Sequence, residues 1–280
     1  MRVYRSIRSL AKKVSEIKKR KKTIGLVPTM GFLHEGHASL IRKARKDTGC
    51  VIVSIFINPA QFGPGEDFKK YPRNLKKDLD LCEKEGADII FVPEAREMYP
   101  DGYSTHVNVE GITEKLCGIS RPGHFRGVTT VVTKLFNITM PDIAYFGQKD
   151  CQQAIVIKKM ALDLNMDVDI KVMPVVRGKN GLAMSSRNVY LGEDERVQAA
   201  SLYKALRLAR RLFNQGERNS GKIISKMKQV ISKEPAAKID YIAIVDTKEL
   251  KAIKKISGVA LVAVAVRVGN TRLIDNVILN

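Results

Sequence analysis

The sequence predicts a Rossmann-like, doubly wound α/β fold with a parallel sheet, followed by a second, smaller α+β domain. Three observations support this prediction. In the first half, short apolar runs alternate with amphipathic stretches, which is the pattern of a parallel sheet with helical crossovers. In the second half, two long helical patterns precede three strand-like runs. A loop with several Gly and Ser residues separates the halves at residues 178–188.

The first domain is predicted to span residues 1–176. Residues 38–46 form a predicted helix because Leu40, Ile41 and Ala44 fall on one face at helical spacing. Residues 75–85 repeat that spacing, and residues 150–164 read as a further helix. The predicted strands are residues 23–27, 50–57, 88–92, 142–146 and 168–176.

The second domain is predicted to span residues 177–280 and to act as a lid over the first. Gly269 and Asn270 lie between the last two apolar runs and indicate a tight hairpin turn. The predicted helices are residues 193–214 and 221–232, and the predicted strands are residues 239–245, 259–268 and 272–278.

Composition limits the protein classes to consider. The 280 residues are 44% hydrophobic, which is enough for a substantial core. No apolar run reaches the roughly 20 residues of a membrane-spanning helix, and the N-terminus lacks a secretory pattern, so we expect a cytoplasmic protein without a membrane segment. The four cysteines are widely spaced and form no CxxC pair, which predicts free thiols.

The charge balance predicts an anionic partner. Lys and Arg number 49 against 29 Asp and Glu, a formal net charge of +20. The densest basic run is residues 18–22, but other basic residues are interspersed with acids. We therefore expect phosphate-bearing small molecules as ligands and no specific nucleic-acid partner, although nonspecific binding at low salt is compatible with this charge.

Two histidines flank a glycine directly after the first of these predicted strands. The run Pro28–His37 reads PTMGFLHEGH and leads into a helix. Gly36 lets the backbone approach a phosphate, and the helix start offers free amide groups. The His34 and His37 imidazoles can stabilise oxygens that gain charge during phosphoryl or adenylyl transfer. A role confined to helix entry is the alternative for both histidines.

Polar side chains follow other predicted strands. Asn58 and Gln61 lie in a loop after an apolar strand, where amides can bind a hydroxyl or carboxylate, although ordinary loop capping would also explain them. Lys149 offers a charge to triphosphate oxygens and Asp150 an acceptor for ribose hydroxyls, unless they form only a solvated pair. His124 precedes an apolar helix and suits a structural hydrogen-bonding role.

The loop between the domains, residues 181–188, reads GLAMSSRN. Ser185, Ser186 and Arg187 suit a flexible lid that closes on phosphates, because the guanidinium matches phosphate geometry. Helix capping by one of the serines is the alternative reading. The segments thus point together to ATP chemistry.

These segments resemble those of the pantothenate synthetase family, a branch of the HxGH nucleotidyltransferase superfamily. The resemblance covers residues 1–190 through five ordered motifs, and the remainder more loosely. It implies that pantoate, ATP and beta-alanine yield pantothenate, AMP and pyrophosphate through pantoyl adenylate. It also implies a homodimer. The family pattern commonly reads LEG where this chain has Leu116, Cys117 and Gly118, so a carboxylate is missing here.

The resemblance also assigns roles to residues. His37 is the expected proton donor, and His34 and Lys149 complete the catalytic set. Mg²⁺ is expected to accompany ATP, and its ligands stay unassigned; Asp78 is the one carboxylate we consider. The expected substrate residues are Gln61, which also lies beside the entering beta-alanine, Gln153 and Asn58. The expected ATP-binding residues are Met30, Gly31, Phe32, Leu33, His34, Glu35, Gly36, His37, Gly147, Gln148, Lys149, Asp150, Val176, Met184, Ser185, Ser186 and Arg187.

Two alternatives stay open from the residues alone. A related nucleotidyltransferase acting on a phosphorylated substrate would need a second phosphate site, which the uncharged Asn58, Gln61 and Gln153 disfavour. An RNA-binding protein with a synthetase-like fold would explain the charge, but it would not need the whole lid sequence.

Overall fold

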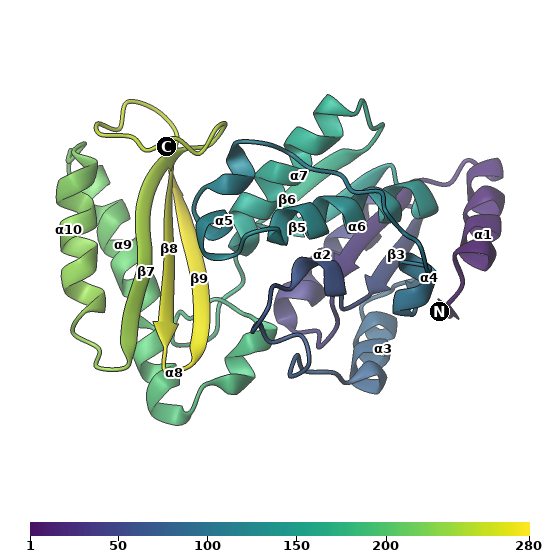
Figure 1. The fold of residues 1–280 in the computed structure, drawn as a ribbon, viewed down its shortest axis with the longest axis horizontal. Coiled ribbons are helices and arrows are strands. Elements are labelled where there is room, and N and C mark those ends of the chain that lie inside the picture. Colours follow the sequence, from purple (N-terminus) through teal and green to yellow (C-terminus); the bar gives the residue numbers. More distant parts are fainter.

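The computed structural model describes residues 1–280, which form two sheets with helices packed around them (Figure 1). The first sheet has six parallel strands in the order β1-β4-β3-β2-β5-β6. The second has three antiparallel strands in the order β7-β8-β9. The fold class predicted from the sequence is confirmed. The strands of the first sheet are β1 (Arg2–Tyr4), β2 (Ile24–Thr29), β3 (Cys50–Ile55), β4 (Ile89–Phe91), β5 (Ile143–Gly147) and β6 (Asp169–Met173).

Helices cover both faces of the parallel sheet, as its apolar strands require. All six residues of β3 are buried, the pattern of a strand packed on two sides. Successive side chains point to opposite faces, so Leu26 packs with one group of helices and Val27 with the other. One face carries α1 (Ile7–Lys19), α6 (His124–Thr139) and α7 (Cys151–Asp163), and the other carries α2 (Glu35–Asp47) and α3 (Leu75–Lys84).

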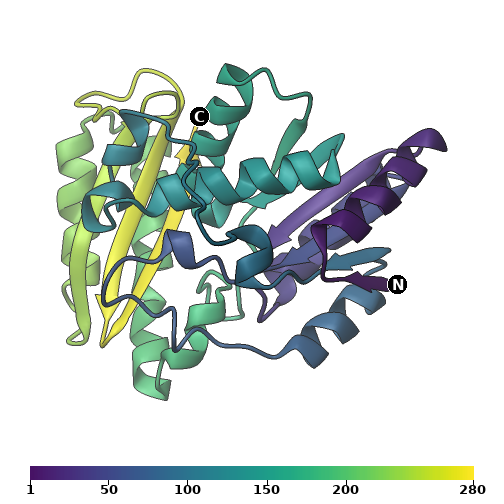
Figure 2. The ribbon, with the colours of Figure 1, turned by 45° about the vertical axis from the view of Figure 1, so that its right-hand side comes forward.

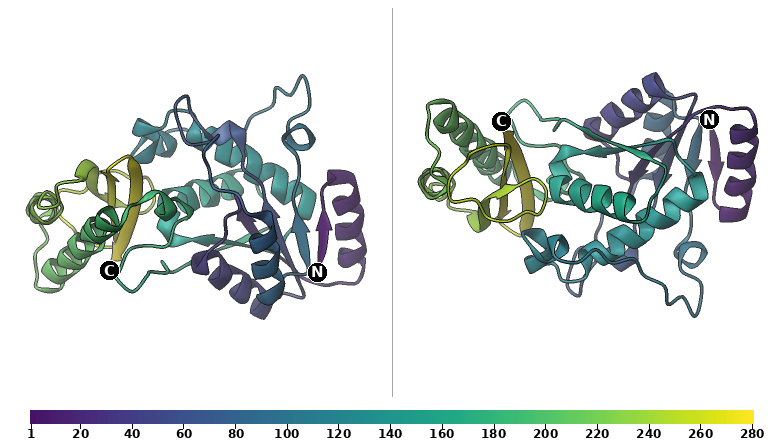
Figure 3. Two further views of the ribbon diagram at one scale, coloured as in Figure 1. Left: turned by 90° about the horizontal axis from the view of Figure 1, so that it is seen from below. Right: turned by 90° about the horizontal axis from the view of Figure 1, so that it is seen from above.

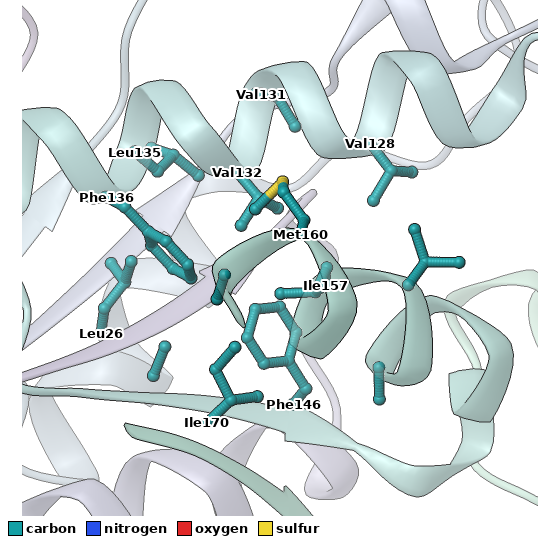
Figure 4. Packing of buried hydrophobic residues seen from close by; sticks show 14 of the residues in the cluster. Leu26, Val128, Val131, Val132, Leu135, Phe136, Phe146, Ile157, Met160 and Ile170 are labelled. Carbon is teal, nitrogen blue, oxygen red and sulfur yellow. The ribbon is translucent and has the colours of Figure 1, made fainter. Parts of the chain in front are cut away.

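The packing between α6 and α7 forms much of the larger core. Figure 4 shows Val132 and Phe136 of α6 beside Met160 of α7 and Phe146 of β5. Figure 2 shows α6 running from the C-terminal sheet across the parallel sheet. The remaining elements before residue 177 are the short helices α4 (Ala95–Met98) and α5 (Cys117–Ser120) and the 3₁₀ turns η1 (Pro59–Gln61), η2 (Ile112–Glu114) and η3 (Gln148–Asp150).

The C-terminal part packs two long helices on the outer face of its own sheet. Its apolar cluster joins α9 and α10 to alternate residues of β8 such as Val262, Val264 and Val266. Figure 3 shows this sheet at the opposite end of the molecule from α1. The elements are η4 (Ser186–Tyr190), α8 (Glu193–Ala199), α9 (Ser201–Asn214), α10 (Ser220–Ile231), β7 (Ala237–Asp246), β8 (Ala260–Val268) and β9 (Thr271–Leu279).

Several local predictions were wrong. The pattern at 193–214 is not one helix, because it breaks at Ala200 between α8 and α9. His124 does not precede the following helix, since α6 begins there. The hairpin at Gly269 is confirmed, because Val268 pairs with Thr271.

The domain boundary at residues 176 and 177 falls between β6 and η4, and it stays a prediction. None of the helices combines the length and apolar character needed to cross a membrane.

Candidate active site

The two turns predicted to bind ATP lie side by side at the carboxyl edge of the parallel sheet. β2 pairs with β3 on one side and with β5 on the other, so the strand order reverses beside β2. Open α/β sheets bind ligands at such a switch point, beyond the carboxyl ends of the strands. The HxGH turn follows β2, and the turn that carries Lys149 follows β5.

Asp78 fixes the backbone of the HxGH turn. Its two carboxylate oxygens accept hydrogen bonds from the amides of Phe32 at 2.9 Å and Leu33 at 2.7 Å. Gly31 has φ +86°, a conformation that L side chains rarely adopt, and a Cβ there would lie 3.1 Å from Asp78. Burial raises the pKa of Asp78 against the opposing effect of the two amides. Asp78 therefore holds the loop, and its position does not favour the magnesium role considered for it.

Each histidine of the motif has one ring nitrogen occupied by the backbone. Nδ1 of His34 accepts a hydrogen bond from the Gly36 amide at 3.1 Å. Nδ1 of His37 accepts one from the His34 amide at 3.3 Å. A neutral imidazole that accepts at Nδ1 carries its proton on Nε2. The fold thus selects the tautomer in which Nε2–H is free to donate.

The surroundings of both imidazoles favour their neutral form. Their ring centroids lie 4.1 Å apart. Burial, with a further contribution from the Lys149 charge, lowers the pKa of His34 to about 4. Burial and the neighbouring His34 hold the pKa of His37 well below its usual value. At neutral pH the pair therefore offers two N–H donors without adding positive charge.

One cleft brings most of the predicted residues together. We call it the central cleft, and its volume is about 210 Å³. The predicted residues that line it come from the HxGH turn, the β3 and β5 loops and the loop before η4. They are Met30, His34, Gly36, His37, Asn58, Gln61, Gly147, Lys149, Asp150, Gln153, Val176, Met184, Ser185, Ser186 and Arg187.

Five predicted ATP-binding residues do not line the central cleft. Glu35 is exposed and pairs with Arg42 on the outer side of α2. Phe32 and Leu33 border a neighbouring hollow, and the Gln148 amide donates to Oδ1 of Asn276 at 3.2 Å. Gly31 allows the loop to bend and lines none of these hollows.

Asn58 is fully occupied within the protein and orients Gln61. Its Nδ2 donates to Oε1 of Gln61 and to the Gly127 carbonyl, both at 3.0 Å. Its Oδ1 accepts from the Ala60 amide at 3.2 Å and from the Tyr99 hydroxyl at 2.8 Å. Nε2 of Gln61 donates to Sδ of Met30 at 3.1 Å, and the side chain so held lines the central cleft.

His124 supports the same loop from the start of α6. Its Nδ1 donates to the Gln61 carbonyl at 2.8 Å, and its Nε2 accepts from Arg121 at 3.0 Å. Burial, together with the Arg121 charge, lowers the pKa of His124 to about 4. The structural hydrogen-bonding role expected for this histidine is confirmed.

Two ion pairs that the sequence analysis missed close one side of the central cleft. Arg187 forms a bidentate pair with Asp67, with both N–O distances at 2.8 Å. Arg121 forms another with Glu66, at 2.7 and 2.6 Å. Although burial opposes it, Arg187 holds the pKa of Asp67 below its usual range. The sequence did not indicate partners for Glu66 and Asp67, because Arg121 lies 55 positions from Glu66 and Arg187 lies 120 positions from Asp67.

The start of η4 and the loop before it are tied to the HxGH turn. The Ser186 hydroxyl donates to the Phe32 carbonyl at 3.1 Å. The Ser185 oxygen accepts from the Arg187 amide at 3.3 Å, which caps η4, and the Met184 amide donates to the Val176 carbonyl at 2.9 Å. The serines thus cap and fasten the loop, so the capping alternative accounts for their contacts here.

The far wall of the central cleft is apolar. Val128, Val131, Val132 and Leu135 project from α6, and Phe56 and Phe146 complete the wall. The amides of Gln61 and Gln153 also line this cleft. A cavity with an apolar wall and uncharged hydrogen-bonding groups suits a small, branched, hydroxylated ligand.

Cys117 lies where the family resemblance leads one to expect a carboxylate. Its Sγ lies 3.2 Å from the Tyr241 hydroxyl and 3.7 Å from Nη1 of Arg272, both from the C-terminal sheet. Arg272 has a carboxylate partner in Asp240 at 2.7 Å. The guanidinium is therefore neutralised without a carboxylate at residue 117.

No group of three or more His, Cys, Asp or Glu side chains is arranged to hold a metal ion. The donor set of the chain therefore does not fit a metal held by the protein alone, and we assign no protein ligand to Mg²⁺.

Comparison with known proteins gives one consistent result. The family model described as pantoate-beta-alanine ligase matches residues 2–278. Pantothenate synthetase of Acetivibrio thermocellus is 55% identical over 278 residues, covering 99% of each chain. Pantothenate synthetase of Thermotoga petrophila is 54% identical over 279 residues, covering 100% of each chain.

Solved structures agree with the sequence relatives. The crystal structure of pantothenate synthetase from Thermus thermophilus superposes with a TM-score of 0.95 at 41% identity, covering 99% of each chain. That of pantoate-beta-alanine ligase from Francisella tularensis, complexed with beta-gamma ATP and beta-alanine, gives a TM-score of 0.81 at 35% identity over 99% of this chain and 97% of that chain.

Proposed function

The chain belongs to the pantoate–beta-alanine ligase family and condenses pantoate with beta-alanine using ATP, and we propose that it works through a pantoyl adenylate formed in the central cleft. One observation carries the proposal. The two Nε2–H donors of the HxGH turn, the Lys149 ammonium and the apolar wall with its glutamine amides all border one cleft.

In the first step a pantoate carboxylate oxygen attacks the α-phosphorus of ATP, and pyrophosphate leaves. Negative charge accumulates on the phosphoryl oxygens and on the leaving group. Neutral His34 and His37 can donate their Nε2–H groups to these oxygens, and Lys149 adds a full positive charge. A bound triphosphate raises the pKa of both imidazoles, which suits His37 to the role of proton donor.

In the second step the beta-alanine amine attacks the acyl carbon, the bond to the phosphate oxygen breaks, and AMP leaves while the amine releases a proton to the departing phosphate or to solvent. Water competes with the amine, because an acyl adenylate hydrolyses readily. The apolar wall and the amides of Gln61 and Gln153 support exclusion of water around the acyl group. We assign Gln61 and Gln153 to pantoate and Asn58 to the orientation of Gln61.

The lid proposal rests on η4 and the loop that leads into it. Arg187 is neutralised by the Asp67 carboxylate. We propose that triphosphate replaces the Asp67 carboxylate as the partner of Arg187, and that Ser185 and Ser186 close with it. Val176 and Met184 line the cleft beside this loop, which supports the proposal that their backbone holds adenine.

Three accompanying features are also proposals. Mg²⁺ would accompany ATP and would offset part of the triphosphate charge, and no residue of the chain is assigned to hold it. The protein is cytoplasmic, since ATP and the four unpaired cysteines suit a reducing compartment. Two copies of the chain form a dimer, as the family resemblance implies, which a sedimentation measurement tests.

Isotope exchange between pyrophosphate and ATP tests the proposed chemistry directly. Exchange should require pantoate and proceed without beta-alanine, and AMP release should require both. His37→Ala should lower the exchange rate about 10²- to 10⁴-fold, because a proton donor is lost. His106→Ala is the matched control, since His106 is exposed and does not line the central cleft. Near-normal exchange by folded His37→Ala would refute the role of His37.

A further inference from the structure

A side chain from the C-terminal sheet holds the turn that carries Lys149. Nδ2 of Asn276, on β9, donates to the carbonyl oxygens of Gln148 at 2.8 Å and Lys149 at 3.0 Å. Its Oδ1 accepts from Nε2 of Gln148 at 3.2 Å. Asn276 is 4% exposed, so both of its amide protons and its oxygen are used inside the protein.

The turn at Lys149 depends on such support. It is a single 3₁₀ turn of three residues, Gln148–Asp150, between the end of β5 and the start of α7. A 3₁₀ turn of this length has too few internal hydrogen bonds to fix its backbone firmly. The one polar partner of the Lys149 ammonium is Asp150, its neighbour in the same turn, at 3.3 Å, so no ion pair ties the ammonium to another element. The two hydrogen bonds from Asn276 hold the consecutive carbonyl groups of Gln148 and Lys149, and they thereby fix the position of the Lys149 Cα.

The neighbour of Asn276 connects the same strand to the lid region. Oδ1 of Asp275 accepts from the Asn276 amide at 2.8 Å. The Asp275 carboxylate also pairs with Arg177 at 2.5 and 3.0 Å, and it is buried. The Arg177 guanidinium lies 3.9 Å from the ring centroid of Tyr203. Asp275 therefore secures β9, and Asn276 on it, against the segment that leads into the lid.

We propose that Asn276 is a positioning residue for adenylation: it fixes the backbone of the Gln148–Asp150 turn so that the Lys149 ammonium reaches the triphosphate. The inference rests on the proposed function, because Lys149 acts on the triphosphate only there. If Asn276 has this role, the first chemical step requires contact between the two sheets. β9 is the strand of its sheet nearest the parallel sheet (Figure 1), which suits this role.

A double-mutant cycle in the full-length protein tests the inference. Asn276→Ala should slow pantoate-dependent pyrophosphate exchange about 10- to 100-fold, because a displacement of about 1 Å at a reacting group has effects of that order. The KM for pantoate should change less than twofold. In a Lys149→Ala background the same substitution should change the rate less than twofold, because positioning has no effect once the ammonium is gone.

Matched variants separate this role from a general structural one. Asn276→Asp keeps the size of the side chain and removes both donors, so it should slow exchange at least as much if Asn276→Ala folds poorly. Asn270→Ala, in the exposed hairpin turn of the same sheet, should leave exchange unchanged. Thermal unfolding of each variant confirms that the protein is folded.

The outcomes are distinguishable. If Lys149→Ala exchanges at the wild-type rate, the proposed role of Lys149 fails, and the inference fails with it. If Lys149→Ala is slow and Asn276→Ala multiplies that loss in full, the proposed function stands and the inference is overturned. A wild-type rate for folded Asn276→Ala and Asn276→Asp also overturns the inference.

Discussion

Replacing Gly127 with alanine should damage pantoate adenylation more than it damages folding. Gly127 lies in α6, where the helix meets the turn that carries Gln61. A Cβ at this position would lie 2.1 Å from the Ala60 carbonyl oxygen and 2.6 Å from the Gln61 amide nitrogen. Real Cβ contacts are essentially never closer than 3.0 Å, so the turn must move about 0.9 Å or more away from α6.

The consequence for activity follows from that displacement. A shift of about 1 Å in a substrate-positioning group costs about 10²-fold in rate. Overpacking of this kind typically costs about 1–3 kcal/mol of stability, which most folded proteins tolerate. Pyrophosphate exchange should therefore fall about 10²-fold at saturating ATP, while ATP binding measured by calorimetry should stay close to that of the wild type, because the HxGH turn is untouched.

Gly258→Ala is the matched control for this experiment. A Cβ at Gly258 meets nothing within 4 Å, so the substitution should leave exchange unchanged. A Gly127→Ala protein that is folded by circular dichroism and exchanges within threefold of the wild type would contradict the reasoning. In that case the turn tolerates the displacement, and the position of Gln61 is not critical.

Three further predictions concern the surrounding contacts. Tyr99→Phe removes the hydroxyl that fixes the Asn58 amide and should lower kcat/KM for pantoate about 5- to 10-fold, since such a bond contributes about 1 kcal/mol; unchanged kinetics would count against the network. Asp67→Asn should tighten ATP binding severalfold in calorimetry because Arg187 loses its competing partner, and weaker binding would contradict the proposed exchange of partners. His124 has a folded pKa of about 4 against 6.5 when unfolded, so below pH 6.5 the unfolded state takes up a proton that the folded state excludes. The free energy of unfolding in urea should consequently fall by about 2 kcal/mol from this group between pH 7 and pH 5, and a pH-independent value in that window would exclude the effect.

Local patterns predicted the strands that place the site, because apolar runs of a parallel sheet are visible along the chain. Most strand ends agree with the predictions within a few residues, as for β2 and β8. Helix α1 was not predicted, although Leu10, Val14 and Ile17 are spaced for one apolar face, because that face is narrow and the helix runs directly into a basic segment. The break at Ala200 had no signal, because alanine favours helices.

Contacts between distant segments could not be predicted from the sequence. Nothing near Glu66 or Asp67 indicates Arg121 or Arg187 as partners, and the grip of Asn276 on the Lys149 turn joins segments 127 and 128 positions apart. The histidine tautomers are a different case. Their capping bonds are local, and the spacing of His34 and His37 at a helix start would have been enough to predict them.

The positions of the four cysteines allow thiol modification to report when the two halves of the protein separate. Cys50 and Cys82 are buried in the core around the parallel sheet, whereas Cys117 and Cys151 border the gap between the two sheets. A thiol reagent such as a maleimide would modify two side chains when the halves separate and all four only when the sheet itself unravels. Counting adducts by mass spectrometry, with and without ATP, would thus report the frequency of each event without any introduced label.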